Sequence, residues 1–158
     1  MNNTFKGKTI LLVEDDPDDI YLIGEAIDEC KMDVRLNIVQ DGEELLEFLT
    51  RTGNYAEENQ SPRPDLIILD LNMPRKDGRE ALEEIKAIPE LRSIPVVVLT
   101  TSKADEDLDR CYRLGASGFI TKPVKFKDLK ETVCKIGSYW LDTVLLPEET
   151  DQEKKEET

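Results

Sequence analysis

Acidic, hydroxyl and lysine side chains follow the short apolar runs of this sequence, at the point where each run ends. Carboxylates follow the first and third runs, at Glu14, Asp15 and Asp70, a hydroxyl follows the fourth at Thr100, and an ammonium follows the fifth at Lys122. Carboxylates that lie close together repel one another unless one is protonated or a cation lies between them. A hard divalent ion with oxygen ligands fits such a group, and Mg2+ typically binds one or two carboxylates together with phosphate oxygens.

The same side chains predict phosphoryl transfer with a carboxylate nucleophile. A transferring phosphoryl group needs donors and cations around its oxygens, and Thr100 and Lys122 supply one of each. The chain contains no histidine, which excludes Ser-His-Asp and Cys-His nucleophiles and histidine-ligated metals. Without a P-loop or a serine nucleophile elbow, the available nucleophile is a carboxylate that forms an acyl phosphate. We predict it to be Asp70, because this residue ends the most apolar run and a turn, Leu71–Pro74, follows it.

Each of these residues also has an ordinary structural explanation. Glu14, Asp15 or Asp16 could simply cap the helix that begins at Pro17. Thr100 could be a strand residue, and Lys122 a solvated lysine. Each alternative is plausible singly, but their joint occurrence at consecutive strand ends favours a functional site.

Short apolar runs alternate with helical periodicity, which predicts a parallel sheet with crossover helices. The expected strands are Thr9–Val13, Arg35–Val39, Leu66–Leu69, Val96–Leu99 and Phe119–Ile120. Asp16 is a suitable N-cap for the first helix, and Ser102 with Asp105 has the form of a capping box. The predicted fold class is α/β, a (βα)5 arrangement of five parallel strands flanked by helices. Sites in such open sheets lie outside the carboxyl ends of the strands.

Length and charge narrow the class of protein further. The chain has 158 residues, which predicts one domain, with 35 acidic against 21 basic side chains and a net charge of −14. This charge argues against direct nucleic-acid binding, which depends on lysine and arginine. No run approaches the roughly 20 apolar residues of a membrane span, and no signal-peptide pattern opens the chain, so a cytoplasmic location is expected. We predict a domain over residues 1–147 and a disordered acidic tail over residues 148–158.

The three cysteines and the last helix allow two further predictions. Cys30, Cys111 and Cys134 are an odd number with wide spacing, which favours buried free thiols over a disulfide or a zinc site. The apolar stripe of the last helix continues beyond the usual end of such a domain. Its final apolar residues predict an interface, with a homodimer favoured over a helix that folds back on its own domain: Trp140, Leu141, Val144, Leu145 and Leu146.

Four segments of the sequence resemble the signature blocks of two-component response-regulator receiver domains. They are LLVEDDP, DLIILDLNMPRKDG, PVVVLTTS and GASGFITKP, in the expected order and spacing across about residues 8–136. The extended loop before the second block and the Tyr-Trp-Leu near the end more narrowly resemble stand-alone regulators that serve phytochrome-type histidine kinases. The resemblance implies a flavodoxin-like receiver fold with an extended C-terminal helix.

The resemblance also implies specific roles. A sensor histidine kinase would phosphorylate Asp70, and Mg2+ would be bound by the carboxylates of Asp15 and Asp70, by the backbone carbonyl of Asn72 and by Glu14 through water. Asn72 and Ser102 would tune hydrolysis of the acyl phosphate. The residues expected to contact phosphoryl oxygens are Thr100 and Lys122.

The implied output is a conformational change rather than substrate turnover. Thr100 would move toward the phosphoryl group while Phe119, at the aromatic switch position, swings inward. A cis peptide before Pro123 would aim Lys122 into the site. Two alternatives stay open: a Mg2+-dependent aspartyl-phosphate phosphatase, against which Asn72 argues because the haloacid-dehalogenase type has Asp there, and a scaffold receiver that is not phosphorylated.

Overall fold

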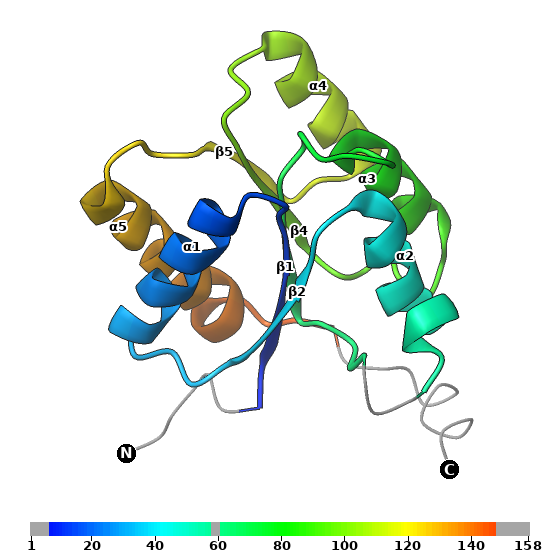
Figure 1. Cartoon of the computed structure of the whole chain (residues 1–158), viewed down its shortest axis with the longest axis horizontal. Helices are drawn as coiled ribbons and strands as arrows, with labels where there is room; N and C mark the ends of the chain where they lie inside the picture. Colours follow the sequence, from blue (N-terminus) through cyan, green and yellow to red (C-terminus); the bar gives the residue numbers. More distant parts are fainter. Residues whose placement is uncertain (1–6, 58–60, 148–158) are drawn as a thin grey trace.

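The computed structural model describes residues 7–57 and 61–147 and contains one sheet of five parallel strands. The strand order is β2-β1-β3-β4-β5 (Figure 1). The strands are β1 Thr9–Val13, β2 Arg35–Val39, β3 Leu66–Leu69, β4 Val96–Thr100 and β5 Gly118–Thr121. The predicted α/β fold is therefore confirmed, and strand bounds differ from the prediction by at most one residue.

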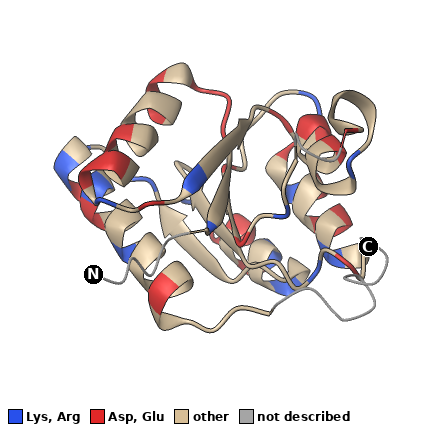
Figure 2. Ribbon diagram, turned by 90° about the horizontal axis from the view of Figure 1, so that it is seen from below, with Lys and Arg blue, Asp and Glu red and all other residues tan. Residues whose placement is uncertain are grey.

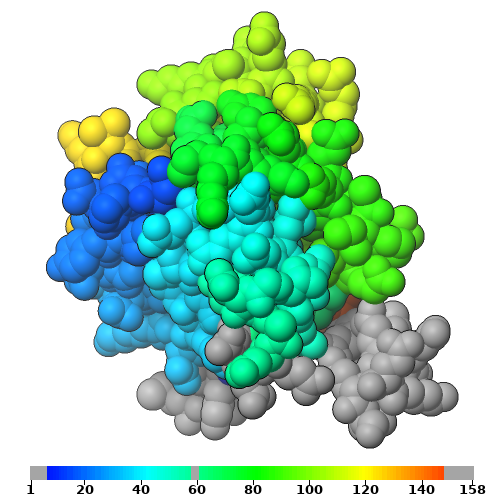
Figure 3. Space-filling model, turned by 45° about the vertical axis from the view of Figure 1, so that its right-hand side comes forward, coloured from blue at the N-terminus to red at the C-terminus, as the bar shows by residue number. Residues whose placement is uncertain are grey.

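Helices cover both faces of the sheet. α1 and α5 lie on one face, and α2, α3 and α4 lie on the other (Figure 1). The helices are α1 Pro17–Glu29, α2 Gly42–Thr50, α3 Gly78–Ala87, α4 Asp105–Leu114 and α5 Phe126–Gly137, with a 3-10 turn at Gly53–Tyr55. α5 continues into a π-helical segment, Ser138–Thr143, which confirms the extended last helix. Figure 3 shows α2 in cyan beside α3 in green.

Two apolar clusters, one on each side of the sheet, make the core. Along β1, Leu11 and Val13 belong to the cluster under α2, α3 and α4, whereas Ile10 and Leu12 belong to the cluster under α1 and α5. The strands of a parallel sheet that is covered on both faces are largely apolar, and β1, β3 and β4 are buried throughout. This explains why their sequences are apolar runs, with threonine only at the start of β1 and at the end of β4.

The observed N-cap agrees with the sequence prediction at α1 but not at α4. The side chain of Asp16 accepts a hydrogen bond from the backbone N–H of Asp18, as predicted for an N-cap. The capping box predicted from Ser102 and Asp105 is wrong, because the N-cap of α4 is Ala104. The Ser102 hydroxyl donates instead to the carboxylate of Asp107, one turn into the helix.

The prediction that the cysteines are free thiols is wrong for two of the three. Cys30, at the end of α1, forms a disulfide with Cys134 of α5, with 5.7 Å between their Cα atoms. The spacing of 104 residues conceals the pair, because only the packing of α1 beside α5 brings the two residues together. Among the described cysteines, Cys111 alone is a free thiol, and it is buried.

The segment after α5 partly folds back on its own domain. Leu141 is only 3% exposed and belongs to the cluster under α1 and α5, and Trp140 and Leu146 pack against the same cluster. Leu145 is 95% exposed, and Val144 is half-buried. Within the described ranges, no helix has both the length and the apolar character needed to cross a membrane.

Candidate functional site

Three carboxylates gather where β1 and β3 end. Val13 and Leu69 are paired in register, so the residues that follow them, Glu14 and Asp70, emerge side by side. Glu14, Asp15 and Asp70 each place one carboxylate oxygen within 4.8 Å of those of the other two. Adjacent parallel strands with matched register therefore build the acidic cluster that the sequence predicts.

Asp70 is prepared for an additional ligand. Its side chain is 8% exposed, and its Oδ1 is buried without a hydrogen-bond partner in the described part of the protein. A buried carboxylate oxygen without a partner is costly. Three converging carboxylates with one oxygen unsatisfied are the donor set that a hard divalent cation prefers. The residues of the site thus fit Mg2+.

Lys122 supplies the positive charge of the site. Its side chain is 8% exposed, its Nζ donates to Oε1 of Glu14 and, at 2.7 Å, to Oδ2 of Asp19, and it lies 3.9 Å from Oδ2 of Asp70. Burial acts to lower the pKa of this ammonium, but the hydrogen bonds to Asp19 and Glu14 and the charge of Asp70 outweigh it, so the pKa is raised. Lys122 is therefore held as a cation at the strand ends.

Glu14 has the most perturbed carboxyl of the cluster. Burial raises its pKa to about 7, against the hydrogen bond from Lys122, and the neighbouring charge of Asp70 adds to the rise. One buried ammonium does not compensate for several carboxylates within this small volume. A further cation is what would allow all of them to be ionised together.

Asp19 is a site residue that the sequence analysis missed. It lies in the first turn of α1, three residues after the N-cap Asp16. Side chains on a helix tilt toward its N-terminus, so an acid at this position points back over the strand end. The position of this acid in the first helical turn could be seen in the sequence. Its ion pair with Lys122 could not, because the two residues are 103 positions apart and meet only in the folded protein.

Thr100 ends β4 and is completely buried. Its Oγ1 accepts a long, 3.4 Å hydrogen bond from the backbone N–H of Ser102. Ser102 in turn donates to Asp107, which also pairs with Arg79 of α3. Hydrogen bonds from Arg79 and then Ser102 lower the pKa of Asp107 to about 2. The loop between β4 and α4 is thus tied to α3 as well as to its own helix.

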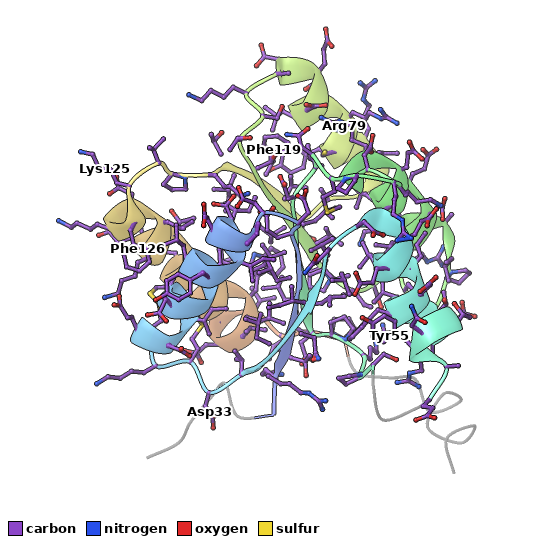
Figure 4. The ribbon with its side chains drawn as sticks, viewed as in Figure 1. Asp33, Tyr55, Arg79, Phe119, Lys125 and Phe126 are labelled. Atoms are coloured by element: carbon purple, nitrogen blue, oxygen red, sulfur yellow. A yellow bond between two sulfur atoms is a disulfide. The ribbon has the colours of Figure 1, made fainter. Side chains whose placement is uncertain are left out.

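Phe119 and Asn72 are the predicted switch residue and the predicted backbone ligand of the metal. Phe119, on β5, is partly buried against the core cluster of the α4 side (Figure 4). Asn72 is exposed in the loop that leaves β3, two residues after Asp70. Both positions remain compatible with the predicted switch and ligand roles.

The cis peptide predicted before Pro123 is wrong. None of the peptide bonds between described residues is cis, so the bond from Lys122 to Pro123 is trans. The trans isomer is favoured by about 0.5–1 kcal/mol even before proline. With this trans bond, the ammonium of Lys122 already reaches the carboxylates of the site.

The loop after Asp70 is held from two sides. Gly78 donates its N–H to the carbonyl of Leu71, and a Cβ atom at Gly78 would lie 2.4 Å from the carbonyl oxygen of Asp70. Gly42 at the start of α2 donates to the carbonyl of Lys76. These close backbone contacts require glycine, and they fix the peptide that carries Asp70.

Acidic residues dominate the helices around the sheet as well. Figure 2 shows Asp and Glu spread over helices on both sides of the strands. The net charge is −14. A phosphoryl donor, which is itself an anion, would therefore meet a net negative charge on approach.

The sequence of this chain is similar to those of response regulators. The sequence profile of the response regulator receiver domain matches residues 10–134. The chain is 49% identical over 140 residues to the response regulator Rcp1 of Synechocystis sp., covering 89% of this chain and 93% of Rcp1. It is 41% identical over 132 residues to the probable methanogenesis regulatory protein FilR2 of Methanothrix harundinacea, covering 84% of this chain and 83% of FilR2.

Solved structures agree with the sequence comparison. The phosphorylated cyanobacterial phytochrome response regulator RcpA superposes with a TM-score of 0.83 at 45% identity, covering 89% of this chain and 99% of RcpA. The Mn2+-bound form of Rcp1 superposes with a TM-score of 0.82 at 48% identity, with the same coverage.

Proposed function

This chain belongs to the response regulator receiver domain family, and from that premise we propose that it accepts a phosphoryl group on Asp70 from a phytochrome-type sensor histidine kinase. The observation that carries the proposal is the acidic cluster of Glu14, Asp15 and Asp70 with one buried, unsatisfied oxygen of Asp70 in the described structure. The similar protein RcpA is a phytochrome response regulator, which supports the kinase class, and the Mn2+-bound structure of Rcp1 supports a divalent ion at the acidic cluster.

The residues that would hold Mg2+ are the carboxylates of Asp15 and Asp70, the backbone carbonyl of Asn72 and, through water, Glu14. When bound, the ion neutralises negative charge on the phosphoryl oxygens. Burial is the main cause of the raised pKa of Glu14, and the ion would relieve the repulsion from Asp70 that adds to it.

In the proposed reaction, a carboxylate oxygen of Asp70 attacks the phosphorus of a phosphohistidine in line. The new oxygen–phosphorus bond forms as the phosphorus–nitrogen bond breaks, and the electron pair leaves with the imidazole nitrogen. The hydroxyl of Thr100 donates to one phosphoryl oxygen and the ammonium of Lys122 pairs with another. Water later hydrolyses the acyl phosphate, with Asn72 and Ser102 beside its path. This is modification of the protein itself, not turnover of a substrate.

The proposed output is a shift in the population of two conformations. Thr100 moves toward the phosphoryl group, and Phe119 follows into the core. The changed surface controls docking or homodimerisation, for which Leu145, fully accessible, and the half-buried Val144 are the predicted interface residues that the last segment leaves outside the core. The charge of −14 opposes nucleic-acid binding, so we propose protein partners in the cytoplasm. We keep residues 1–147 as the proposed domain; the predicted tail, residues 148–158, lies outside the described residues.

The test is intact-mass spectrometry after incubation with Mg2+ and acetyl phosphate. Wild type should gain one phosphoryl group, and Asp70→Asn should gain none. Asp33→Asn is the matched control, because it removes the same charge from an exposed residue at the opposite end of the molecule (Figure 4). Size-exclusion chromatography of the modified protein then tests dimerisation. A folded wild type that takes up no phosphate would contradict the proposal and leave a scaffold receiver.

A further inference from the structure

Lys122 has two hydrogen-bonded partners in the structure, and neither is Asp70. An ammonium has three donors, of which Glu14 and Asp19 each accept one. The distance of 3.9 Å from Nζ to Oδ2 of Asp70 is too long for a hydrogen bond. The cation that should stabilise the phosphoryl group is therefore held beside Asp70 rather than on it.

Asp19 differs from the other carboxylates around Lys122. Glu14 and Asp70 belong to the cluster whose oxygens converge on a possible metal position, but Asp19 does not. Asp19 is anchored on the first turn of α1, and its side chain is 27% exposed. Its ion pair with the buried Lys122 therefore ties the ammonium to α1, whereas the second hydrogen bond of Lys122, to Glu14, ties it to the acidic cluster.

We propose that Asp19 is a positioning residue that holds Lys122 away from Asp70 in the unphosphorylated protein and thereby opposes the phosphorylated state. The inference rests on the proposed function, because it concerns the same phosphoryl group. For Lys122 to pair fully with a phosphoryl oxygen, its bond to Asp19 must weaken or break. The carboxylate of Asp19 also repels the added negative charge at short range.

Removal of the Asp19 charge should therefore favour the phosphorylated state. With Asp19→Asn, the ammonium loses one of its two carboxylate partners and keeps only Glu14, so it can move toward Asp70 more easily, and one source of repulsion is gone. An ion pair of this kind contributes up to about 1 kcal/mol, which corresponds to roughly a five-fold change in an equilibrium constant.

The equilibrium is measured most directly with beryllium fluoride, a non-covalent analogue of the phosphoryl group, titrated into the full chain at saturating Mg2+. Asp19→Asn should bind it about five-fold more tightly than wild type. Asp18→Asn is the matched control, since it removes the same charge from an exposed neighbour on the same helical turn. Asp19→Glu, which keeps the charge, should stay close to wild type. Asp19→Ser serves as a second neutral variant if Asp19→Asn does not fold.

A second readout follows Lys122 itself, without metal or analogue. In protein with lysines labelled with carbon-13 at Cε, the Lys122 resonance, assigned with Lys122→Arg, should shift in Asp19→Asn and not in Asp18→Asn. An unchanged Lys122 resonance in Asp19→Asn would show that Asp19 does not hold the ammonium in solution and would overturn the inference.

The outcomes separate the inference from the proposed function. A wild type that binds no beryllium fluoride and takes up no phosphate contradicts the proposed function. A wild type that binds the analogue while Asp19→Asn binds it equally or more weakly overturns the role of Asp19 and leaves the proposed function intact.

Discussion

Arg79 of α3 donates two parallel hydrogen bonds to the carboxylate of Asp107 in α4. Nε lies 2.6 Å from Oδ1 and Nη2 lies 2.7 Å from Oδ2. Both side chains are 17% exposed, so this bidentate pair is better protected from water than an ordinary surface ion pair. Since Ser102 donates to the same carboxylate, the pair connects α3 to the loop that follows Thr100.

The first prediction concerns the pH dependence of this ion pair. The pKa of Asp107 falls from 3.8 to about 2, so the native state favours its ionised form. That stabilisation is fully present above pH 3.8 and is lost as the pH falls toward 2. Asp107→Asn should lower the free energy of unfolding by about 1–2 kcal/mol at pH 7 and by almost nothing near pH 2.

Urea denaturation of wild type and variant across this pH range measures the difference. Asp109→Asn, at an exposed position on the same helix, is the control and should change little. An equal loss for Asp107→Asn at pH 7 and pH 2 would show that packing, not charge, accounts for the effect.

The second prediction tests the close contact behind Asp70. A Cβ atom at Gly78 would lie 2.4 Å from the carbonyl oxygen of Asp70 and 2.8 Å from Cα of Leu71, both rigid backbone atoms. Gly78→Ala should therefore lower the free energy of unfolding by about 1–3 kcal/mol and reduce phosphorylation by acetyl phosphate.

Gly24→Ala provides the opposite control. A Cβ atom there meets no described atom within 4 Å, and Gly24 lies inside α1, so alanine should stabilise the protein by about 0.5–1 kcal/mol. Thermal unfolding followed by circular dichroism compares the two. If Gly78→Ala proves as stable and as readily phosphorylated as wild type, the contact does not hold Asp70 in place.

The third prediction concerns the metal. If the acidic cluster binds Mg2+, the ion should stabilise the folded protein, by about 2.7 kcal/mol at one hundred times the dissociation constant. Asp15→Asn should abolish most of this gain, and a chelator should remove it from wild type. Differential scanning calorimetry with and without Mg2+ measures the change.

Asp16→Asn is the matched control for the metal experiment. It removes the same charge from the neighbouring residue but keeps an N-cap, since asparagine caps helices about as well as aspartate. Mg2+ should stabilise this variant as it does wild type. An equal loss in both variants would point to general electrostatics instead of a ligand at Asp15.

The fourth prediction concerns the cysteines. In protein kept oxidised and then unfolded in denaturant, an alkylating reagent should modify one thiol, that of Cys111. Reduction should lower the free energy of unfolding by about 2–4 kcal/mol, because the bridge between Cys30 and Cys134 closes a long loop. Cys30→Ser should be insensitive to reductant. Alkylation of three thiols without reduction would show that the pair is not bridged in solution.

Local pattern alone predicted most of the architecture. The continuous apolar runs that become β1, β3 and β4 identify strands covered on both faces, because an exposed face would show polar residues at alternate positions. Since the carboxyl ends of parallel strands share one edge of a sheet, the sequence alone predicts that the residues after each run lie together. The acidic cluster and the position of Lys122 follow from this rule.

Contacts between residues far apart in the chain were decided only by the tertiary structure. The disulfide of Cys30 with Cys134 and the pairing of Asp19 with Lys122 each join residues more than 100 positions apart. The burial of Leu141 likewise depends on the π-helical segment that continues α5, which packs part of the predicted interface onto its own domain. Periodicity reports which face of an element is apolar, whereas partner choice depends on how helices pack across the sheet, and that information is not local in the sequence.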